Sequence, residues 1–304
     1  MPIDSLPEIP DELRRLMAEI GPRWRENVSG NVNIMLDRFS AVLERGPASV
    51  ADVVSDIAYG DHERQRLDLF SPRHQSGLRP VVLFVHGGAF VSGHRNRTAQ
   101  IYANVLHYLA RFGIAGVNIG YRLADAVTFP GASLDIAAAL DWVHAKADLY
   151  RIDRNRIFLM GHSAGAAHVG TYAYDPLFAD RRAGRLAGMI VVSGRVRADA
   201  LDENPNARKV QTYYGTDPSR YEACSPVAHV NSQSVPTFVA WAEFENPLVD
   251  VYCAELAYRL AVAKRRSPPV LWLRGHNHTS SIAHIGTSEE ILGQAIRDFI
   301  HAPS

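Results

Sequence analysis

Ser163 is the residue whose surroundings point most directly to chemistry. It lies in the segment Gly-His-Ser-Ala-Gly at 161–165, which has the pattern G-x-S-x-G. An apolar run at 156–160, typical of a buried strand, comes directly before it, and a run of small residues at 164–174, typical of a helix, comes directly after it. A sharp turn between a strand and a helix exposes the serine hydroxyl beside a helix N-terminus, where developing negative charge is favoured. We therefore predict a serine nucleophile; the alternative is an ordinary turn of glycine and serine.

A second glycine-rich turn follows another apolar, strand-like run. Its sequence is His-Gly-Gly-Ala-Phe at 86–90. Backbone N–H groups in such a turn can face a pocket and bind the oxyanion of a tetrahedral intermediate. We expect the oxyanion hole to be formed by Gly88 and Ala89 together with Ala164, with Gly87 shaping the turn. A phosphate-binding turn is disfavoured, because the chain has neither G-x-G-x-x-G nor a P-loop lysine here.

A serine nucleophile needs a base, and the base needs a carboxylate that orients it. The acid of such sites follows a late strand, and the strand predicted at 236–241 is followed by several acidic residues. Glu245 is our first candidate, Glu243 the second and Asp250 the third. Each of them could also be a solvent-exposed carboxylate in a loop.

The base should follow the last strand, which we predict at 270–273. Two histidines come next, and we expect His278 to be the base, with His276 as the alternative or as a neighbour in the pocket wall. The pair could also bind a metal ion. No Asp, Glu or Cys stands beside them at ligand spacing, so a metal ion is not expected. Hydrolysis by a serine, a histidine and a carboxylate needs no cofactor, so none is expected.

The elements that must position these residues change in character along the chain. From Asp52 onward, strand-like apolar runs alternate with helical segments, which predicts an α/β fold with a mostly parallel central sheet and helices on both faces. The first 50 residues instead indicate two helices, at 11–20 and 31–45, which either pack on the body or form a cap over a pocket. We predict one domain overall, with a helical segment at 1–50 and a catalytic part at 51–304.

Composition excludes several classes of protein. The chain has 304 residues, with 32 Lys and Arg against 32 Asp and Glu, so its formal net charge is zero. Such a chain has no broad positive field for nucleic acid or an anionic membrane. Hydrophobic residues make up 47%, which excludes disorder for most of the chain. The longest apolar runs have the length of strands, so no transmembrane helix is expected.

The two cysteines, Cys224 and Cys253, are too few for a disulfide framework and are expected to be free thiols in a reducing compartment. The N-terminal residues lack the basic start and apolar run of a secretory signal. We therefore expect a cytoplasmic protein.

Taken together, these residues resemble the α/β-hydrolase fold, and within it the HGG-type carboxylesterases related to hormone-sensitive lipase and to kynurenine formamidase. The resemblance covers most of the chain from about Asp56 onward. Besides the two glycine-rich turns, it is carried by Asp-Ile-Ala-Tyr-Gly at 56–60, Leu-Asp-Leu-Phe-Ser-Pro at 67–72, Gly-Tyr-Arg-Leu-Ala at 120–124, Phe-Pro-Gly-Ala-Ser-Leu-Asp at 129–135, Ala-Glu-Phe-Glu at 242–245 and Gly-His-Asn-His at 275–278.

The resemblance aligns Glu245 with the catalytic carboxylate of these enzymes and His278 with their base. The chain also departs from the family pattern. Ala89 stands where many relatives have a third glycine, although its N–H can still donate. Glu245 replaces the commoner aspartate, Ala242 replaces a glycine, and Thr279 stands where an aromatic residue often follows the base.

Motifs and resemblance together predict a serine hydrolase that cleaves carboxylic esters of small to medium neutral molecules through an acyl-enzyme. One alternative is an arylformamidase or amidase with the same triad, acting on substrates like N-formylkynurenine; the other is a non-catalytic binding protein with this fold. Phe90, Tyr121, Phe129 and His162 are expected in the substrate pocket. An exposed apolar helix face would also let two copies pair as a homodimer.

Overall fold

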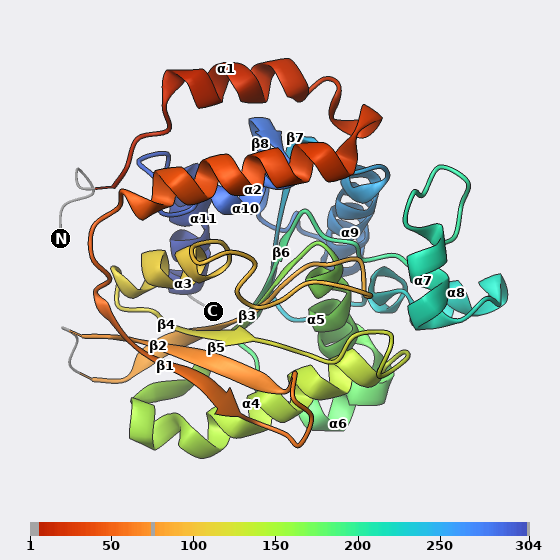
Figure 1. Ribbon diagram of the computed structural model, residues 1–304. Coiled ribbons are helices and arrows are strands. Elements are labelled where there is room, and N and C mark those ends of the chain that lie inside the picture. Colours follow the sequence, from red (N-terminus) through yellow and green to blue (C-terminus); the bar gives the residue numbers. More distant parts are fainter. Residues whose placement is uncertain (1–5, 74–76, 303–304) are drawn as a thin grey trace.

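An eight-stranded sheet forms the centre of the computed structural model, which describes residues 6–73 and 77–302 (Figure 1). The strand order is β1-β2-β4-β3-β5-β6-β7-β8; β2 runs antiparallel to β1 and β4, and the other neighbours are parallel. The predicted, mostly parallel sheet is therefore confirmed. The strands are β1 (Ala51–Ala58), β2 (Arg66–Pro72), β3 (Arg79–Val85), β4 (Ala115–Ile119), β5 (Ile152–His162), β6 (Gly188–Val192), β7 (Thr237–Phe244) and β8 (Val270–Asn277).

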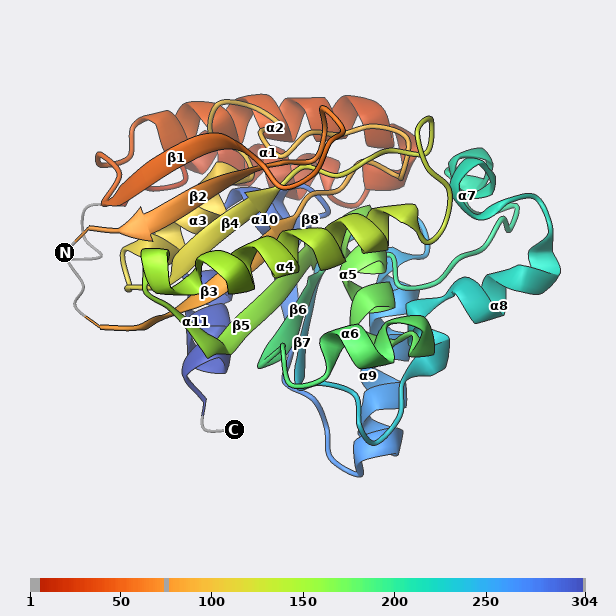
Figure 2. The same ribbon diagram turned by 90° about the horizontal axis from the view of Figure 1, so that it is seen from below.

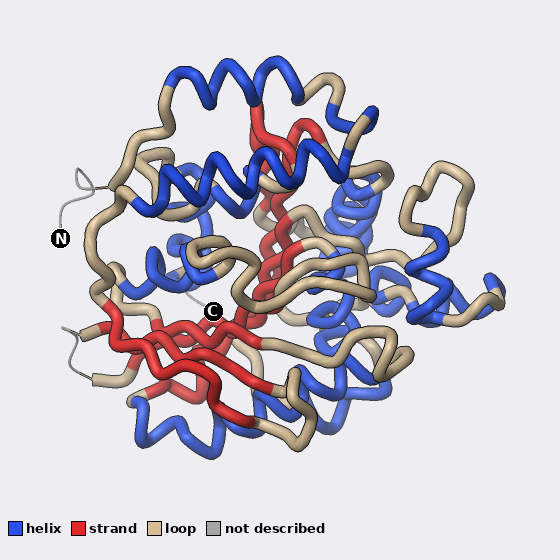
Figure 3. The backbone as a smooth tube through the Cα atoms, viewed as in Figure 1, coloured by secondary structure: helices blue, strands red, loops and turns tan. Residues whose placement is uncertain are grey.

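Helices cover both faces of this sheet, and the tube in Figure 3 shows its strands (red) twisting between them. The longer helices are α1 (Asp11–Ile20), α2 (Val28–Glu44), α3 (Ala103–Ala110), α4 (Gly131–Tyr150), α5 (Ala164–Tyr174), α7 (Ala207–Tyr214), α9 (Val249–Lys264) and α11 (Ile291–His301). The short ones are η2 (Trp24–Glu26), η3 (Pro176–Phe178), α6 (Ala179–Arg182), η4 (Pro218–Arg220), α8 (Tyr221–Cys224), η5 (Pro226–His229) and α10 (Ser280–Ala283).

Each face of the sheet has its own apolar core. Side chains alternate across a strand, so Val81 and Leu83 of β3 join one core and Val82 and Phe84 join the other. The first core packs against α4, α5 and α9; the second packs against α1, α2, α3 and α11. Figures 1 and 2 show α4 on the opposite side of the sheet from α1, α2 and α3. Burial on both faces explains why the central strands have continuous apolar sequences.

Some elements differ in extent from their sequence predictions. The helix expected at 98–112 begins only at Ala103, because the Thr98 hydroxyl accepts hydrogen bonds from the N–H groups of Gln100 and Ile101 and holds a turn there. Strands β7 and β8 continue to Phe244 and Asn277, beyond their predicted ends. Glu243 and His276 therefore lie within strands and not in the loops after them.

The N-terminal helices are packed into the body of the molecule. In Figure 1, α1 and α2 (red) form a layer above the sheet. Met35 and Phe39 of α2 are completely buried in the second core. The side chain of Asn27 accepts a hydrogen bond from Gly30 N and starts α2 three residues before the predicted position.

The turn between β5 and α5 needs glycine on both sides of Ser163, which itself has a φ of 55°. A Cβ added to Gly165 would lie 2.1 Å from the carbonyl oxygen of Val85, and one added to Gly161 would lie 2.6 Å from the backbone nitrogen of Ala166. Both neighbours are backbone atoms, which cannot rotate away. This turn therefore holds α5 directly against the end of β3.

We expect Gly165→Ala to destabilise the protein by about 3 kcal/mol or more, because the new methyl group collides with backbone. Gly184→Ala is the control: it has a φ of 65° but no atom within 4 Å of the added Cβ, so only the backbone strain of about 1 kcal/mol remains. Urea unfolding measures both changes. Equal losses in the two variants would contradict the steric argument.

Candidate active site

Ser163 is held in its strained conformation by hydrogen bonds from three directions. Its N–H donates to the carbonyl of Val192 at 3.2 Å, and its own carbonyl accepts from Arg195 N at 3.0 Å and Ala166 N at 3.1 Å. A positive φ is unfavourable for a residue with a side chain and persists only where the surroundings enforce it. The side chain lines a cavity of about 350 Å³.

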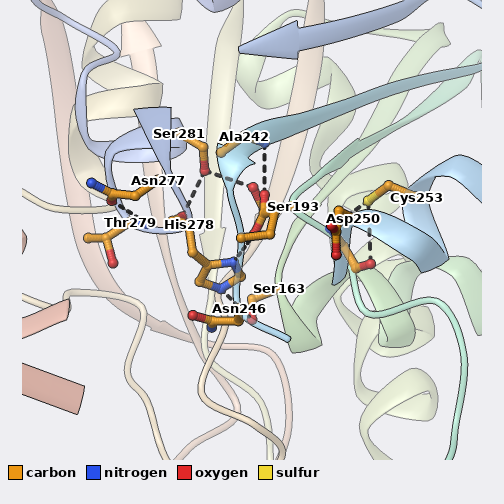
Figure 4. A network of polar contacts seen from close by, with 12 residues as sticks. Ser163, Ser193, Ala242, Asn246, Asp250, Cys253, Asn277, His278, Thr279 and Ser281 are labelled. Carbon is orange, nitrogen blue, oxygen red and sulfur yellow. Dashed lines mark hydrogen bonds and ion pairs between the residues drawn. The ribbon is translucent and has the colours of Figure 1, made fainter. Parts of the chain in front are cut away.

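The structure brings the side chains of Ser163, His278 and Glu245, the first choices from the sequence, into a continuous chain of contacts. Ser163 Oγ lies 3.1 Å from His278 Nε2, and His278 Nδ1 lies 2.6 Å from Glu245 Oε2 (Figure 4). The second carboxylate oxygen, Glu245 Oε1, accepts from Ala242 N at 2.8 Å. Glu245 is 1% exposed. A buried charge needs hydrogen-bond partners, and both carboxylate oxygens of Glu245 have one.

The alternative acids and base have other partners. Glu243 Oε2 accepts from Gly275 N at 2.7 Å across to strand β8. Asp250 pairs with Arg25 at 3.1 Å, and His276 Nε2 contacts Glu289 at 3.1 Å. Glu243 and His276 lie inside β7 and β8, whereas Glu245 and His278 follow the ends of these strands, so the two members of each pair reach different surroundings.

His162, next to the serine, fixes the backbone of His278. Burial lowers the pKa of His162 to about 3, so its ring is neutral. Its Nε2 lies 3.1 Å from the carbonyl oxygen of His278, a geometry that assigns the proton to Nε2. Ser281 Oγ donates to the same carbonyl at 2.8 Å and is itself contacted by Ser193 at 2.9 Å. Figure 4 shows this part of the network above the His278 ring.

The glycine-rich turn at 86–90 lies against the serine. A Cβ added to Gly87 would lie 2.8 Å from Ser163 Cβ, and Gly88 has a φ of 147°. In the described part of the chain, the N–H groups of Gly88, Ala89 and Ala164 donate no hydrogen bond to another protein atom, and all three residues line the cavity. These N–H groups are therefore free to bind a ligand oxygen.

The four residues expected in the pocket wall have different positions relative to the cavity. His162 lines the cavity, but Phe90, Tyr121 and Phe129 do not. The first two are buried in the core behind the turn, where Phe90 stacks on Tyr213 with ring centroids 5.2 Å apart and the Tyr121 hydroxyl donates to the carbonyl of His86. Phe129 packs on Tyr214 in the same aromatic cluster. Their apolar rings gain more from packing together than from facing a partly open cavity.

One wall that sequence reasoning did not assign comes from the N-terminal segment. Val28, Val32 and Leu36 of α2 line the cavity together with Ser29 and Asn33. Their spacing along the helix is the signal that could have indicated a shared face. The direction of that face is set by tertiary packing.

The same segment also contacts the loop that carries the buried carboxylate. Trp24 Nε1 donates to Asn246 Oδ1 at 2.8 Å, and Asn246 follows Glu245 directly and lines the cavity. Gly21 packs so closely on Phe244 that an added Cβ would lie 2.4 Å from its ring. The segment thus holds both sides of Glu245.

The described residues contain neither a metal site nor a membrane-spanning helix. Between residues 6–73 and 77–302, no three His, Cys, Asp or Glu side chains cluster closely enough to hold a metal ion. None of the helices in these ranges combines the length and apolarity needed to cross a membrane.

Comparison with known proteins agrees with the fold and motifs. The family model BD-FAE matches residues 67–175. Esterase LipC of Mycobacterium tuberculosis is 30% identical over 73% of this chain and 58% of its own length. Isoprenylcysteine alpha-carbonyl methylesterase ICME of Arabidopsis thaliana is 32% identical over 51% of this chain and 35% of its own. The chain thus spans about a third to three fifths of the length of these curated relatives.

Solved structures show the same fold over nearly the whole chain. A bacterial heroin esterase has a TM-score of 0.68 at 23% identity and covers 97% of this chain and 93% of its own. A hyperthermophilic esterase from the archaeon Pyrobaculum calidifontis has a TM-score of 0.67 at 20% identity and covers 96% and 98%.

The sheet topology and the solved structures agree that the chain has the α/β-hydrolase fold. Its motifs resemble those of the HGG-type carboxylesterases.

Four buried histidines make stability depend on pH. Burial lowers the pKa of His86, His162, His168 and His284 from 6.5 to about 3. As the pH falls from 6.5 toward 3, the unfolded chain binds protons that the folded chain does not. Each of these histidines therefore lowers the free energy of unfolding by about 1.4 kcal/mol per pH unit in that window.

We expect His168→Phe to reduce this slope by about one proton. His168 Nε2 is buried and has no hydrogen-bond partner among the described residues, and its ring packs edge-on against Phe90 and Tyr213, so phenylalanine keeps the contacts. Urea unfolding at several pH values measures the slope. The exposed His94, changed to Gln, is the control, and an unchanged slope in His168→Phe would argue against a neutral buried ring.

Proposed function

We propose that this protein hydrolyses carboxylic esters through Ser163, His278 and Glu245. The observation that carries the proposal is the continuous line of contacts from the cavity-facing Ser163 Oγ through the His278 ring to the buried Glu245 carboxylate. The esterase names of the curated relatives support the reaction class.

The geometry suits acyl transfer in two steps. His278 Nε2 takes the proton of Ser163 Oγ as the oxygen attacks the ester carbonyl, and Glu245 accepts the hydrogen bond from Nδ1 and stabilises the imidazolium that forms. The N–H groups of Gly88, Ala89 and Ala164 bind the oxyanion; each such donor contributes about 3 kcal/mol in well-studied hydrolases.

Collapse of the tetrahedral intermediate breaks the bond to the alcohol, which leaves with the proton from His278. Water then attacks the acyl-enzyme while His278 again acts as the base, and the acid product and free serine are released. These steps use only protein groups and water.

The N-terminal segment at 1–50 is proposed to act as a cap that limits substrate size. Helix α2 supplies an apolar wall of the cavity, and Trp24 holds the loop beside Glu245. A location in the cytoplasm and pairing of two copies stay predictions from the sequence.

Ser163→Ala should lower kcat/KM on p-nitrophenyl acetate by about 10⁴-fold or more, because it removes the oxygen that forms the acyl-enzyme. Glu245→Gln should lower it by about 10³- to 10⁴-fold, because the amide cannot stabilise the imidazolium. The measurement is p-nitrophenol release together with covalent labelling by a fluorophosphonate probe.

Asp250→Asn and Glu243→Gln are the matched controls, since these carboxylates pair elsewhere and should stay within a few-fold of the unaltered protein. Full activity and labelling of Ser163→Ala would overturn the proposal and favour a binding protein. A large loss in Asp250→Asn alone would move the acid to that residue.

The cap is tested by narrowing its wall. Val32→Trp should shift the preference toward shorter acyl chains and raise KM for longer ones, because the larger ring occupies cavity volume. Ile34→Trp on the same helix is the control: Ile34 is 39% exposed and does not line the cavity. The measurement is KM and kcat/KM for a series of p-nitrophenyl esters of increasing acyl-chain length. Identical dependence on chain length in the two variants would contradict the cap proposal.

A further inference from the structure

The charged side chains around the cavity are all of one sign. Its lining includes Arg97, Arg195 and Lys209, and no Asp or Glu among the described residues. Arg97 lies in the loop that follows the glycine-rich turn, and Lys209 lies in the first turn of α7. Two separate elements thus bring positive charge to the same cavity.

Arg195 differs from the other two because its charge is partly balanced. It is buried, and it lies 3.8 Å from a carboxylate oxygen of Asp199. It also donates to Asn204 at 3.2 Å and stacks over the Tyr252 ring. Its contacts fix it as part of the wall.

Arg97 and Lys209 are exposed, and neither forms an ion pair or side-chain hydrogen bond with any part of the chain that the structure describes. A charged side chain that stabilises the fold normally forms such contacts. The remaining cavity walls do not offset their charge, since α2 contributes Val28, Val32 and Leu36 with the neutral Ser29 and Asn33. Exposed cations in a cavity lining that contains no carboxylate create a local potential that attracts anions.

We propose that the cavity binds esters that carry a carboxylate in addition to the ester group, with Arg97 and Lys209 as the residues that select for it. The inference rests on the proposed ester hydrolysis and names its substrate class. The guanidinium of Arg97 can pair with a carboxylate through two parallel hydrogen bonds, and the Lys209 ammonium adds a point charge. The apolar α2 wall suits the hydrocarbon part of the same molecule.

The test uses two esters with the same p-nitrophenyl leaving group and the same glutaryl chain: mono-p-nitrophenyl glutarate, which has a free carboxylate, and its methyl ester, in which a methyl group neutralises that carboxylate. Release of p-nitrophenol is followed for both, with spontaneous hydrolysis subtracted. We expect the unaltered protein to have a higher kcat/KM for the anionic ester. That ratio should fall as salt is raised, because salt screens exposed charges.

Arg97→Gln and Lys209→Gln should each lower the ratio by about two- to five-fold, mainly through KM of the anionic ester. The double variant should approach the product of the two effects. Arg208→Gln is the matched control: Arg208 is an exposed neighbour on α7 outside the cavity lining, and its loss should leave the ratio unchanged.

A binding measurement separates this inference from the proposed reaction. Calorimetric titration of Ser163→Ala with monomethyl glutarate should show binding that Arg97→Gln and Lys209→Gln weaken. The neutral ester could be cleaved while both substitutions leave unchanged the ratio of kcat/KM values and the binding of monomethyl glutarate. In that case the inference is wrong and the esterase proposal stands. If neither ester is cleaved but binding depends on both cations, the anion site stands and the reaction does not.

Discussion

The close approach of two backbone segments at the ends of β3 and β5 determines how the site is arranged. The position of a Cβ on Gly165 is blocked by the Val85 carbonyl, and Gly87 lies almost as close to the side chain of Ser163. Backbone atoms cannot rotate out of such a contact. The contact therefore sets the distance between the serine and the free N–H groups of the glycine-rich turn. Stabilisation of an oxyanion depends on donors that are in place before the charge develops.

Burial of the Glu245 carboxylate is a second constraint, and it links distant parts of the chain. A charge removed from water must be paired, and here the partners are the His278 ring and the Ala242 N–H. The loop that supplies the carboxylate is fixed from outside by Trp24, more than two hundred residues away in sequence. The N-terminal helices thus belong to the surroundings of the site as well as to its wall.

The whole chain has no net charge, whereas the charged residues that line the cavity are all positive. Equal numbers of acidic and basic residues give no net charge, which suits the neutral substrate expected from the sequence. Net charge averages over the entire surface, whereas a ligand in a cavity responds to groups within about a Debye length of it, roughly 10 Å. Arg97 and Lys209, far apart in sequence, become neighbours of one cavity only in the folded chain.

The sequence by itself determined the alternation of strands and helices, the sharp turn at Ser163 and the glycine-rich turn at 86–90, because these follow from local sterics and side-chain periodicity. It also ranked Glu245 and His278 first, but it could not separate them from Glu243 and His276. That separation depends on where β7 and β8 end, which is fixed by pairing between strands. Only the tertiary structure placed Phe90, Tyr121 and Phe129 in a packed cluster and turned α2 toward the cavity. Which face of an element meets the site is decided by long-range packing, and no local pattern contains that information.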